Sequence, residues 1–198
     1  MPRPNVEAER REQILQAACH VIAEQGFRAL RLADVAKVAG LSSGILHYYF
    51  TNKRDLVRAA FEQNVARSFA RRTAILESDT DAVSKLRALV DAYLPADDET
   101  VESWHVWAEL WVEAIHDPDL QDLNERAYGE WRRLIAGIVR DGQAAGQIGD
   151  ADAVELANLL VAVLDGLALQ VLAGSRNMTL ARMRTTCQSF IDRVILPR

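Results

Sequence analysis

The chain has 198 residues, a formal net charge of −5 at pH 7 and 49% hydrophobic residues. This composition is typical of a folded globular protein and excludes a collagen-like, disordered or linker-dominated chain. No run of about 18 uncharged apolar residues occurs, so we expect no membrane-spanning helix, and the charged N-terminus is unlike a signal peptide. Cys19 and Cys187 form no CxxC motif and have apolar neighbours, which predicts buried free thiols in a reducing cytoplasm.

Charge is divided unevenly along the chain. Residues 1–75 contain twelve Lys and Arg and seven Asp and Glu, a net charge of +5, whereas residues 76–198 carry a net charge of −10. A basic segment on an acidic body indicates a nucleic-acid-binding end. A chance imbalance between solvated surfaces would give the same numbers, so charge alone leaves both interpretations open.

Apolar residues recur at helical spacing throughout the chain, and alternating β-branched patterns are nearly absent, so we predict an all-α fold. An N-terminal three-helix helix-turn-helix domain is expected at residues 1–52, followed by a C-terminal helical bundle at residues 53–198. The predicted helices, roughly nine in number, lie at residues 6–25, 32–39, 43–50, 53–77, 82–94, 100–116, 117–145, 151–173 and 180–195.

The segment 32–50 has the layout of a helix-turn-helix. Gly40 permits the tight turn, and the Ser42 hydroxyl is expected to cap the second helix by accepting a backbone N–H. Leu46 and Phe50 share the inward face of that helix, four residues apart. Its outer face then presents Ser43, Gly44, Ile45, His47 and Tyr48. Such a face suits contact with base edges in the major groove, whereas an unrelated compact helical hairpin is the alternative.

A longer motif surrounds this segment: Phe27-x3-Arg31-Leu-x-Asp34-Val-Ala-x2-Ala39-Gly-Leu-Ser-x-Gly44-Ile-Leu-x-Tyr48-Tyr-Phe50-x2-Lys53-x2-Leu56. It resembles the DNA-binding segment of the tetracycline-repressor (TetR) family. The resemblance implies that Lys53 binds a phosphate and that His47 and Tyr48 contact DNA. It also implies that Ser43, Gly44 and Ile45 face the bases.

Arg31 departs from the pattern of this family, which commonly has Thr or Ser at that position. A small hydroxyl there caps the helix and contacts a phosphate. Arg31 cannot cap by the same route, but its guanidinium suits a bidentate phosphate contact. His47 stands where the family has a tyrosine, which leaves the base preference open.

The remainder of the chain also resembles this family, in helix order and in two short motifs. Trp107-x2-Leu110-Trp111-x4-His116-Asp-Pro118-x-Leu120 and Leu164-Asp-Gly-Leu167 resemble the choline-responsive BetI-type subgroup. The resemblance implies a ligand-binding and dimerisation domain. It does not identify the ligand, because such C-terminal regions vary greatly.

One face of the predicted helix at 100–116 gathers Trp104, Trp107, Ala108, Trp111 and Ile115. Such a stripe is typical of a helix that faces the core, and it also suits the wall of a ligand cavity. Aromatic walls beside a carboxylate favour a hydrophobic or cationic organic molecule. The candidate effector-binding residues are therefore Trp104, Trp107, Glu109, Trp111, Tyr128, Trp131 and Asp165.

The opposite face of this helix carries two Glu-x-x-His pairs, Glu102/His105 and Glu113/His116. They lie on one helix about 16 Å apart, at about 1.5 Å per residue, so they cannot share one metal ion. We interpret them as a polar face and expect no metal and no cofactor.

The predicted helix at 151–173 is apolar nearly all round, so two of its faces must be covered. One face suits its own domain and the other suits a second copy of the chain. We predict that Leu160, Leu164, Leu167 and Val171 form the dimer interface. A central helix of a monomer is the alternative.

These features predict a cytoplasmic, ligand-responsive transcriptional regulator of the TetR type, acting as a repressor. We expect a homodimer on a palindromic double-stranded DNA operator, released by a small-molecule effector, with no membrane partner. A helical-bundle enzyme is an alternative, although no nucleophile–base pair, phosphate loop or metal-ligand spacing supports it. A protein-only adaptor would leave the basic N-terminus unexplained.

Overall fold

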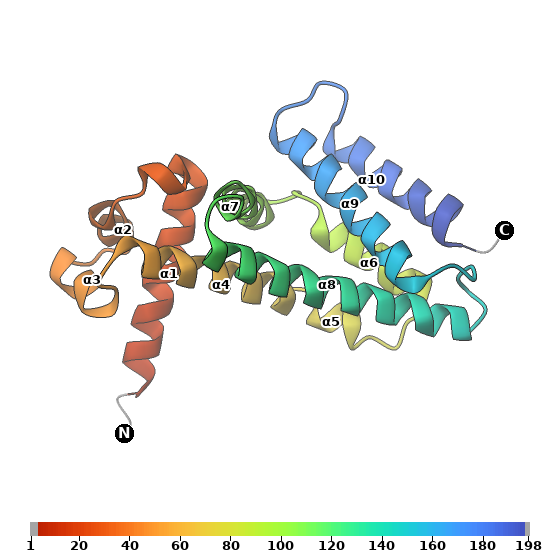
Figure 1. Cartoon of the computed structure of the whole chain (residues 1–198), viewed down its shortest axis with the longest axis horizontal. Helices are drawn as coiled ribbons and strands as arrows, with labels where there is room; N and C mark the ends of the chain where they lie inside the picture. Colours follow the sequence, from red (N-terminus) through yellow and green to blue (C-terminus); the bar gives the residue numbers. More distant parts are fainter. Residues whose placement is uncertain (1–3, 197–198) are drawn as a thin grey trace. The chain divides into compact units, whose positions relative to one another are not determined.

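The computed structural model describes residues 4–196, and within that range the chain forms ten α-helices and one short π-helix, with no strand (Figure 1). The helices are α1 (Pro4–Ala29), α2 (Leu32–Val38), α3 (Ser43–Tyr49), α4 (Lys53–Ala70), α5 (Thr73–Leu76), α6 (Ala82–Tyr93), α7 (Asp98–Ala114), α8 (Pro118–Ala144), α9 (Ala153–Leu172), α10 (Leu180–Phe190) and the π-helix η1 (Ile191–Ile195). The predicted all-α fold is confirmed.

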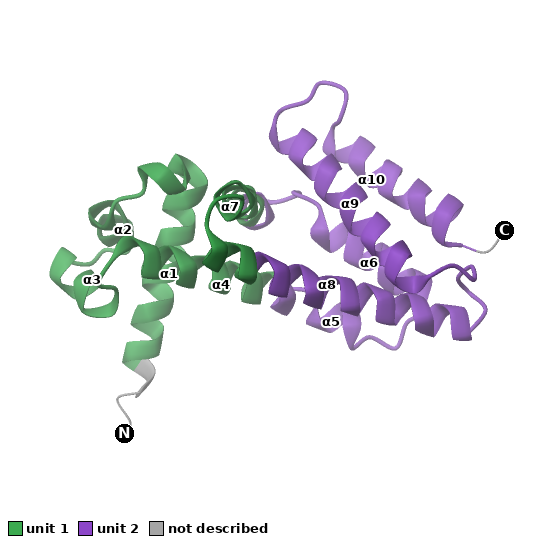
Figure 2. Ribbon diagram, viewed as in Figure 1, with its two compact units in different colours: residues 1–68, 102–123 green, residues 69–101, 124–198 purple. Residues whose placement is uncertain are grey.

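The chain divides into two compact units (Figure 2). Unit 1 comprises residues 1–68 and 102–123, and unit 2 comprises residues 69–101 and 124–198. These units differ from the predicted division at residue 52, because α7 contributes to the core of unit 1. Its apolar side chains, among them Val106 and Leu110, belong to the same buried cluster as α1 to α4.

Local signals in the sequence determine the geometry of the helix-turn-helix. Gly40 has φ +65°, a conformation that favours glycine, and it forms the turn after α2. The Ser42 hydroxyl accepts a hydrogen bond from the Ile45 N–H at 3.3 Å and caps α3. Leu46 and Phe50 are buried. The predicted turn, cap and inward face are therefore all present.

The predicted helix at 53–77 is interrupted between α4 and α5. The Arg72 N–H donates to the Phe69 carbonyl at 2.9 Å, which closes the last turn of α4 before α5 begins. The Arg72 side chain is only 5% exposed. The prediction of a continuous helix was wrong because the segment contains no glycine or proline that would mark the break. Side-chain burial at Arg72 accompanies the break.

Unit 2 contains α5, α6, most of α8, α9, α10 and η1, with α10 packed against α9 and α6. Side-chain caps begin three of its helices. The carboxylates of Asp81 and Asp152 accept from backbone N–H groups in the first turns of α6 and α9, and the Thr179 hydroxyl does so in α10. Both cysteines are buried free thiols, as predicted, with Cys187 in this unit.

Among the residues that the structure describes, α9 is the one helix long and apolar enough to cross a membrane, judged by length and composition alone. It carries Glu155 and Asp165, and its Leu160 and Leu164 are buried against other parts of the protein. The core helix of a soluble protein has the same length and composition, so this observation is weak evidence for a membrane span.

Within unit 1, the predicted polar face of α7 holds the C-terminal part of α1. The Glu109 carboxylate accepts a hydrogen bond from the Phe27 N–H at 2.6 Å. That N–H directly follows Gly26, whose φ of +79° takes the backbone out of helical geometry. On the same face of α7, Glu102 lies 2.9 Å from His20 and Glu113 lies 3.1 Å from Arg28.

We predict that Glu109→Ala lowers the free energy of unfolding by about 1.5–3 kcal/mol, because it leaves the Phe27 N–H without its charged acceptor. Urea denaturation followed by circular dichroism would measure the change. Glu113→Ala is the matched control and should cost less than about 1 kcal/mol, since its partner Arg28 is largely exposed. Equal costs for the two variants would contradict a special role for the Glu109 contact.

Candidate functional site

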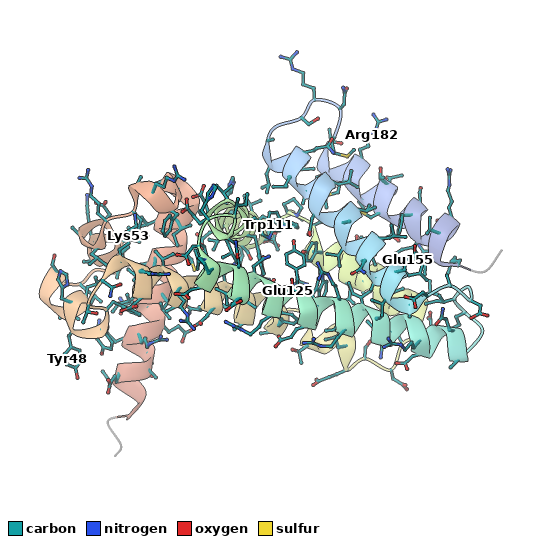
Figure 3. All side chains as sticks on the ribbon, in the orientation of Figure 1. Tyr48, Lys53, Trp111, Glu125, Glu155 and Arg182 are labelled. Carbon is teal, nitrogen blue, oxygen red and sulfur yellow. The ribbon has the colours of Figure 1, made fainter. Side chains whose placement is uncertain are left out.

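The outer face of α3 is exposed while its inner face is fixed in the core. Leu46 is fully buried, whereas Ile45 is 42% and Tyr48 75% exposed. Figure 3 shows the Tyr48 side chain at the outer edge of α3. Ser43, Gly44 and His47 are also exposed, so the structure places every predicted base-facing residue on one accessible surface. An exposed isoleucine and tyrosine on a short helix suit contact with another molecule better than with water alone.

Lys53, the first residue of α4, is held in place by two contacts. Its ammonium group donates a hydrogen bond to the Arg28 carbonyl at 3.0 Å and lies 4.7 Å from the centre of the Phe27 ring. The sequence did not indicate either contact. An ammonium group has three donors, so this hydrogen bond leaves capacity for a phosphate.

Arg31 occupies the N-cap position of α2, with φ −120° and ψ 143°, and makes no side-chain capping hydrogen bond. Its side chain is exposed. This placement agrees with the expectation that Arg31 cannot cap the helix as a hydroxyl would. The guanidinium stays on the surface, at the start of the helix that precedes α3.

The predicted effector residues fall into two groups, one in each unit. Unit 1 contains Trp104, Trp107 and Trp111 of α7, with ring-centre distances of 6.0 Å between Trp104 and Trp111 and 6.3 Å between Trp107 and Trp111. Glu109 belongs to the same helix, but its carboxylate oxygen is bound to the Phe27 N–H. This contact gives Glu109 a structural role in holding α1.

The second group surrounds Asp165 in unit 2. The Asp165 carboxylate accepts hydrogen bonds from the hydroxyls of Tyr93 at 2.9 Å and Tyr128 at 2.5 Å. Burial raises the pKa of Asp165 above its ordinary value, while the two hydroxyl hydrogen bonds oppose that rise. Burial and the nearby carboxylate raise the pKa of both tyrosines, so their hydroxyls remain donors at neutral pH. The carboxylate is thereby fixed in position.

Tyr93 also connects Asp165 to a ring pair and a buried cation. The rings of Tyr93 and Trp131 are nearly parallel, with centres 5.5 Å apart. The guanidinium carbon of Arg72 lies 4.8 Å from the Tyr93 ring centre and 4.9 Å from that of Trp131. The buried indole nitrogen of Trp131 has no hydrogen-bond acceptor among the described residues. We call Arg72, Tyr93, Tyr128, Trp131 and Asp165 the aromatic–carboxylate cluster.

Sequence reasoning missed two members of this cluster, Arg72 and Tyr93. Arg72 lay inside a predicted continuous helix, and Tyr93 lay in the last turn of another. Neither position carries a motif. Only the fold brings Tyr93 to Asp165, which is 72 residues away along the chain.

The structure corrects the residues proposed for the dimer interface. Leu160 and Leu164 are each 1% exposed and lie inside their own protomer, so neither can contact a partner directly. Leu167 and Val171 are half-buried at the margin. The exposed face of α9 instead presents Leu159, Ala162, Gly166 and Leu169. A helix that is apolar all round carries no periodicity to indicate which leucines point inward.

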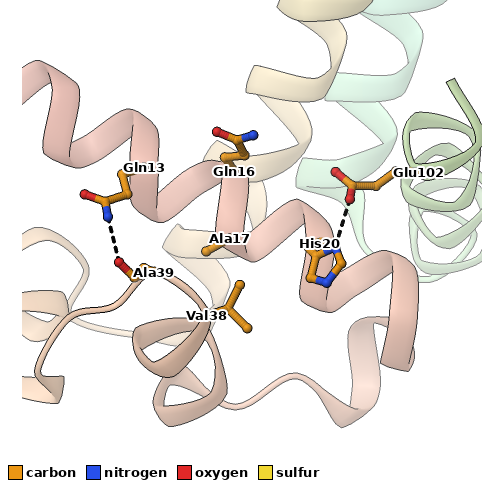
Figure 4. A pocket seen from close by; sticks show the side chains of 7 residues that line it. All are labelled: Gln13, Gln16, Ala17, His20, Val38, Ala39 and Glu102. Atoms are coloured by element: carbon orange, nitrogen blue, oxygen red, sulfur yellow. Dashed lines mark hydrogen bonds and ion pairs between the residues drawn. The ribbon is translucent and has the colours of Figure 1, made fainter. Parts of the chain in front are cut away.

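A separate pocket of about 300 Å³ lies in unit 1 (Figure 4). Gln13 donates to the Ala39 carbonyl at 2.7 Å on one side of it, and His20 pairs with Glu102 on the other. None of the predicted effector residues lines this pocket. Within the described part of the chain, no group of three or more His, Cys, Asp or Glu side chains is placed to hold a metal ion.

Comparisons with known proteins agree on one family. Residues 14–60 match the family described as bacterial regulatory proteins, tetR family, and residues 82–196 match the BetI-type transcriptional repressor C-terminal family. The HTH-type transcriptional regulator BetI of Paraburkholderia phytofirmans is 32% identical over 202 residues, covering the whole of both chains.

Solved structures agree with this assignment. A transcriptional regulator from Saccharomonospora viridis, crystallised in complex with choline, is 37% identical, with a TM-score of 0.91 over 96% of this chain and 100% of that one. A TetR-family regulator from a Rhodococcus species is 31% identical, with a TM-score of 0.83 over 95% of this chain and 99% of the other. These relatives are transcriptional regulators, not enzymes. The chain belongs to the TetR family of bacterial transcriptional regulators, with a C-terminal region of the BetI type.

Proposed function

We propose that this regulator is a cytoplasmic homodimeric repressor that binds a palindromic operator and is released by a small organic cation. The observation that carries the proposal is the outer face of α3, which is exposed while the inner face is buried. A recognition helix requires this division, because one face anchors it and the other reads the major groove.

The exposed residues suggest how the contacts with DNA are divided among them. Arg31 and Lys53 carry the positive charges that would bind phosphates and set the register, together with Tyr48. Ile45 and His47 would then set the base preference, since an apolar side chain suits a thymine methyl group and an imidazole can donate or accept.

We predict that Lys53→Ala weakens binding to all DNA sequences and makes the salt dependence of log K shallower by about one unit, because one phosphate contact is lost. Gel shifts on the DNA upstream of its own gene, at several salt concentrations, would measure both effects. Lys85→Ala is a matched control, since the Lys85 ammonium donates to the Leu76 carbonyl as Lys53 does to Arg28, but in unit 2. If Lys53→Ala behaves like Lys85→Ala, the proposed docking of α3 and α4 is wrong.

The exposed face of α9 supports the proposed dimer. Leu159 and Leu169 are about two-fifths exposed, and the small residues Ala162 and Gly166 lie between them. A Cβ added at Gly166 would meet nothing within 4 Å in its own protomer. Glycine inside a helix costs about 0.5–1 kcal/mol relative to alanine, so close approach of a partner helix would explain its presence here.

Leu159→Glu should convert the dimer to monomers and abolish operator binding together. The dissociation constant of the dimer should rise by more than about tenfold, because an unpaired charge would be buried at the interface. Analytical ultracentrifugation would measure it, with Val112→Glu, an exposed apolar position of unit 1, as the control. A monomeric wild-type protein, or a Leu159→Glu variant that remains dimeric, would count against this interface.

The aromatic–carboxylate cluster supports an organic cation as the effector. Ring faces attract cations, and aromatic cages are used to recognise quaternary ammonium groups. The Asp165 carboxylate supplies a fixed negative charge beside the rings. A relative 37% identical to this chain was crystallised with choline, which is such a cation. A ligand that favours a dimer form unable to span the operator would shift the population away from DNA.

A further inference from the structure

We propose that Arg72 is an internal competitor of the effector: its guanidinium covers the Tyr93 and Trp131 rings in the ligand-free chain, and an organic cation binds by displacing it. The inference rests on the proposed function, because it takes the aromatic–carboxylate cluster as the effector site. It adds a residue that sets both the affinity and the response of that site.

The geometry of Arg72 is that of a bound cation. Its guanidinium carbon lies 4.8 Å and 4.9 Å from two ring centres, within the about 6 Å over which cations are attracted to aromatic faces. The two rings are nearly parallel, with an interplanar angle of 7°, and the same guanidinium lies within this range of both. An external cation that used these rings would need the space that the guanidinium holds.

Displacement of the Arg72 guanidinium from the rings is favoured by the cost of keeping a charged group away from water. The side chain is almost fully buried, and loss of hydration lowers its pKa to about 10. The group is still charged at pH 7, since its pKa lies well above that value. When an external cation replaces it, the guanidinium returns to water and regains hydration, which offsets the lost ring contacts.

The Trp131 indole N–H offers a hydrogen bond that an external ligand can accept and Arg72 cannot. Its buried N–H donates to no acceptor among the described residues. A guanidinium has only donors, so Arg72 cannot satisfy that N–H. A cation that also carries a hydroxyl or another acceptor oxygen can contact the rings and accept from Trp131. The favoured effector is therefore an organic cation with an acceptor oxygen.

Because Arg72 lies just after α4, its displacement would affect the end of that helix. Arg72 follows the last residue of α4 by two positions, and its N–H closes that helix by donating to the Phe69 carbonyl. The first residue of α4 is Lys53, directly after the helix-turn-helix. Removing the side chain from the rings therefore acts on the end of the helix whose start is proposed to contact DNA.

The test is titration of the full chain with choline chloride, followed by tryptophan fluorescence and calorimetry. Arg72→Met removes the competing charge while keeping an apolar stem, and we expect it to bind choline at least about tenfold more tightly than wild type. Arg72→Lys keeps a cation and should bind choline less tightly than Arg72→Met.

Arg132→Met is the matched control, because the Arg132 guanidinium lies 5.1 Å from the Tyr128 ring and its loss changes the net charge equally. It should change choline affinity by less than about threefold. If choline affinity rises by the same factor in Arg132→Met, the effect is one of general electrostatics and the inference is overturned. Unchanged or weaker choline binding by Arg72→Met would also overturn it.

A measurement on the wild-type protein keeps the inference testable if Arg72→Met fails to fold. The Arg72 Nε–H signal should lose its ring-current shift when choline is added, and a signal that choline leaves unmoved would overturn the inference. Choline binding with an unimproved Arg72→Met would overturn the inference alone. Absence of choline binding to wild type and variants would overturn the effector assignment as well, while operator binding would remain intact.

Discussion

The guanidinium of Arg72 lies against the rings of Tyr93 and Trp131 at the point where α4 ends, and several features of the protein depend on that contact. It accompanies the end of a helix in a segment without glycine or proline, and it stabilises a charge that is almost fully buried. Through Tyr93, the same ring pair is joined to the Asp165 carboxylate and so to α9. A cation, two aromatic faces and a fixed carboxylate therefore lie together, which is the chemistry needed to exchange one cation for another.

Helix α7 illustrates how one element serves two purposes within unit 1. Its acidic face holds α1 through Glu102, Glu109 and Glu113, and the Glu109 contact supports the backbone at Gly26. Another face carries the tryptophans. With these contacts and the shared apolar core, α7 and the helix-turn-helix lie in one compact unit, although residues 50–97 separate α3 from α7 in the sequence. Helix α7 thus supports α1, the helix against which α2 packs.

The sequence was most informative where the physics is local. Gly40, Ser42 and Leu46 were predicted correctly because a turn, a cap and an inward face depend on residues within a few positions of one another. Contacts such as Glu109 with Phe27, or Tyr93 with Asp165, join residues 82 and 72 positions apart and leave no local pattern. The prediction of which α9 residues face outward was wrong for another reason. A helix that is apolar on every side gives no signal to tell the exposed Leu159 from the buried Leu160.

If an organic cation controls DNA binding by this chain, cation and operator must weaken each other's binding by the same factor. The most direct measurement is the affinity of choline for the free protein and for the protein saturated with operator. It is paired with the affinity of the operator in the presence and absence of saturating choline. We predict that both ratios are equal and lie between about 5 and 150. Identical choline affinity for free and operator-bound protein would contradict ligand control of this regulator.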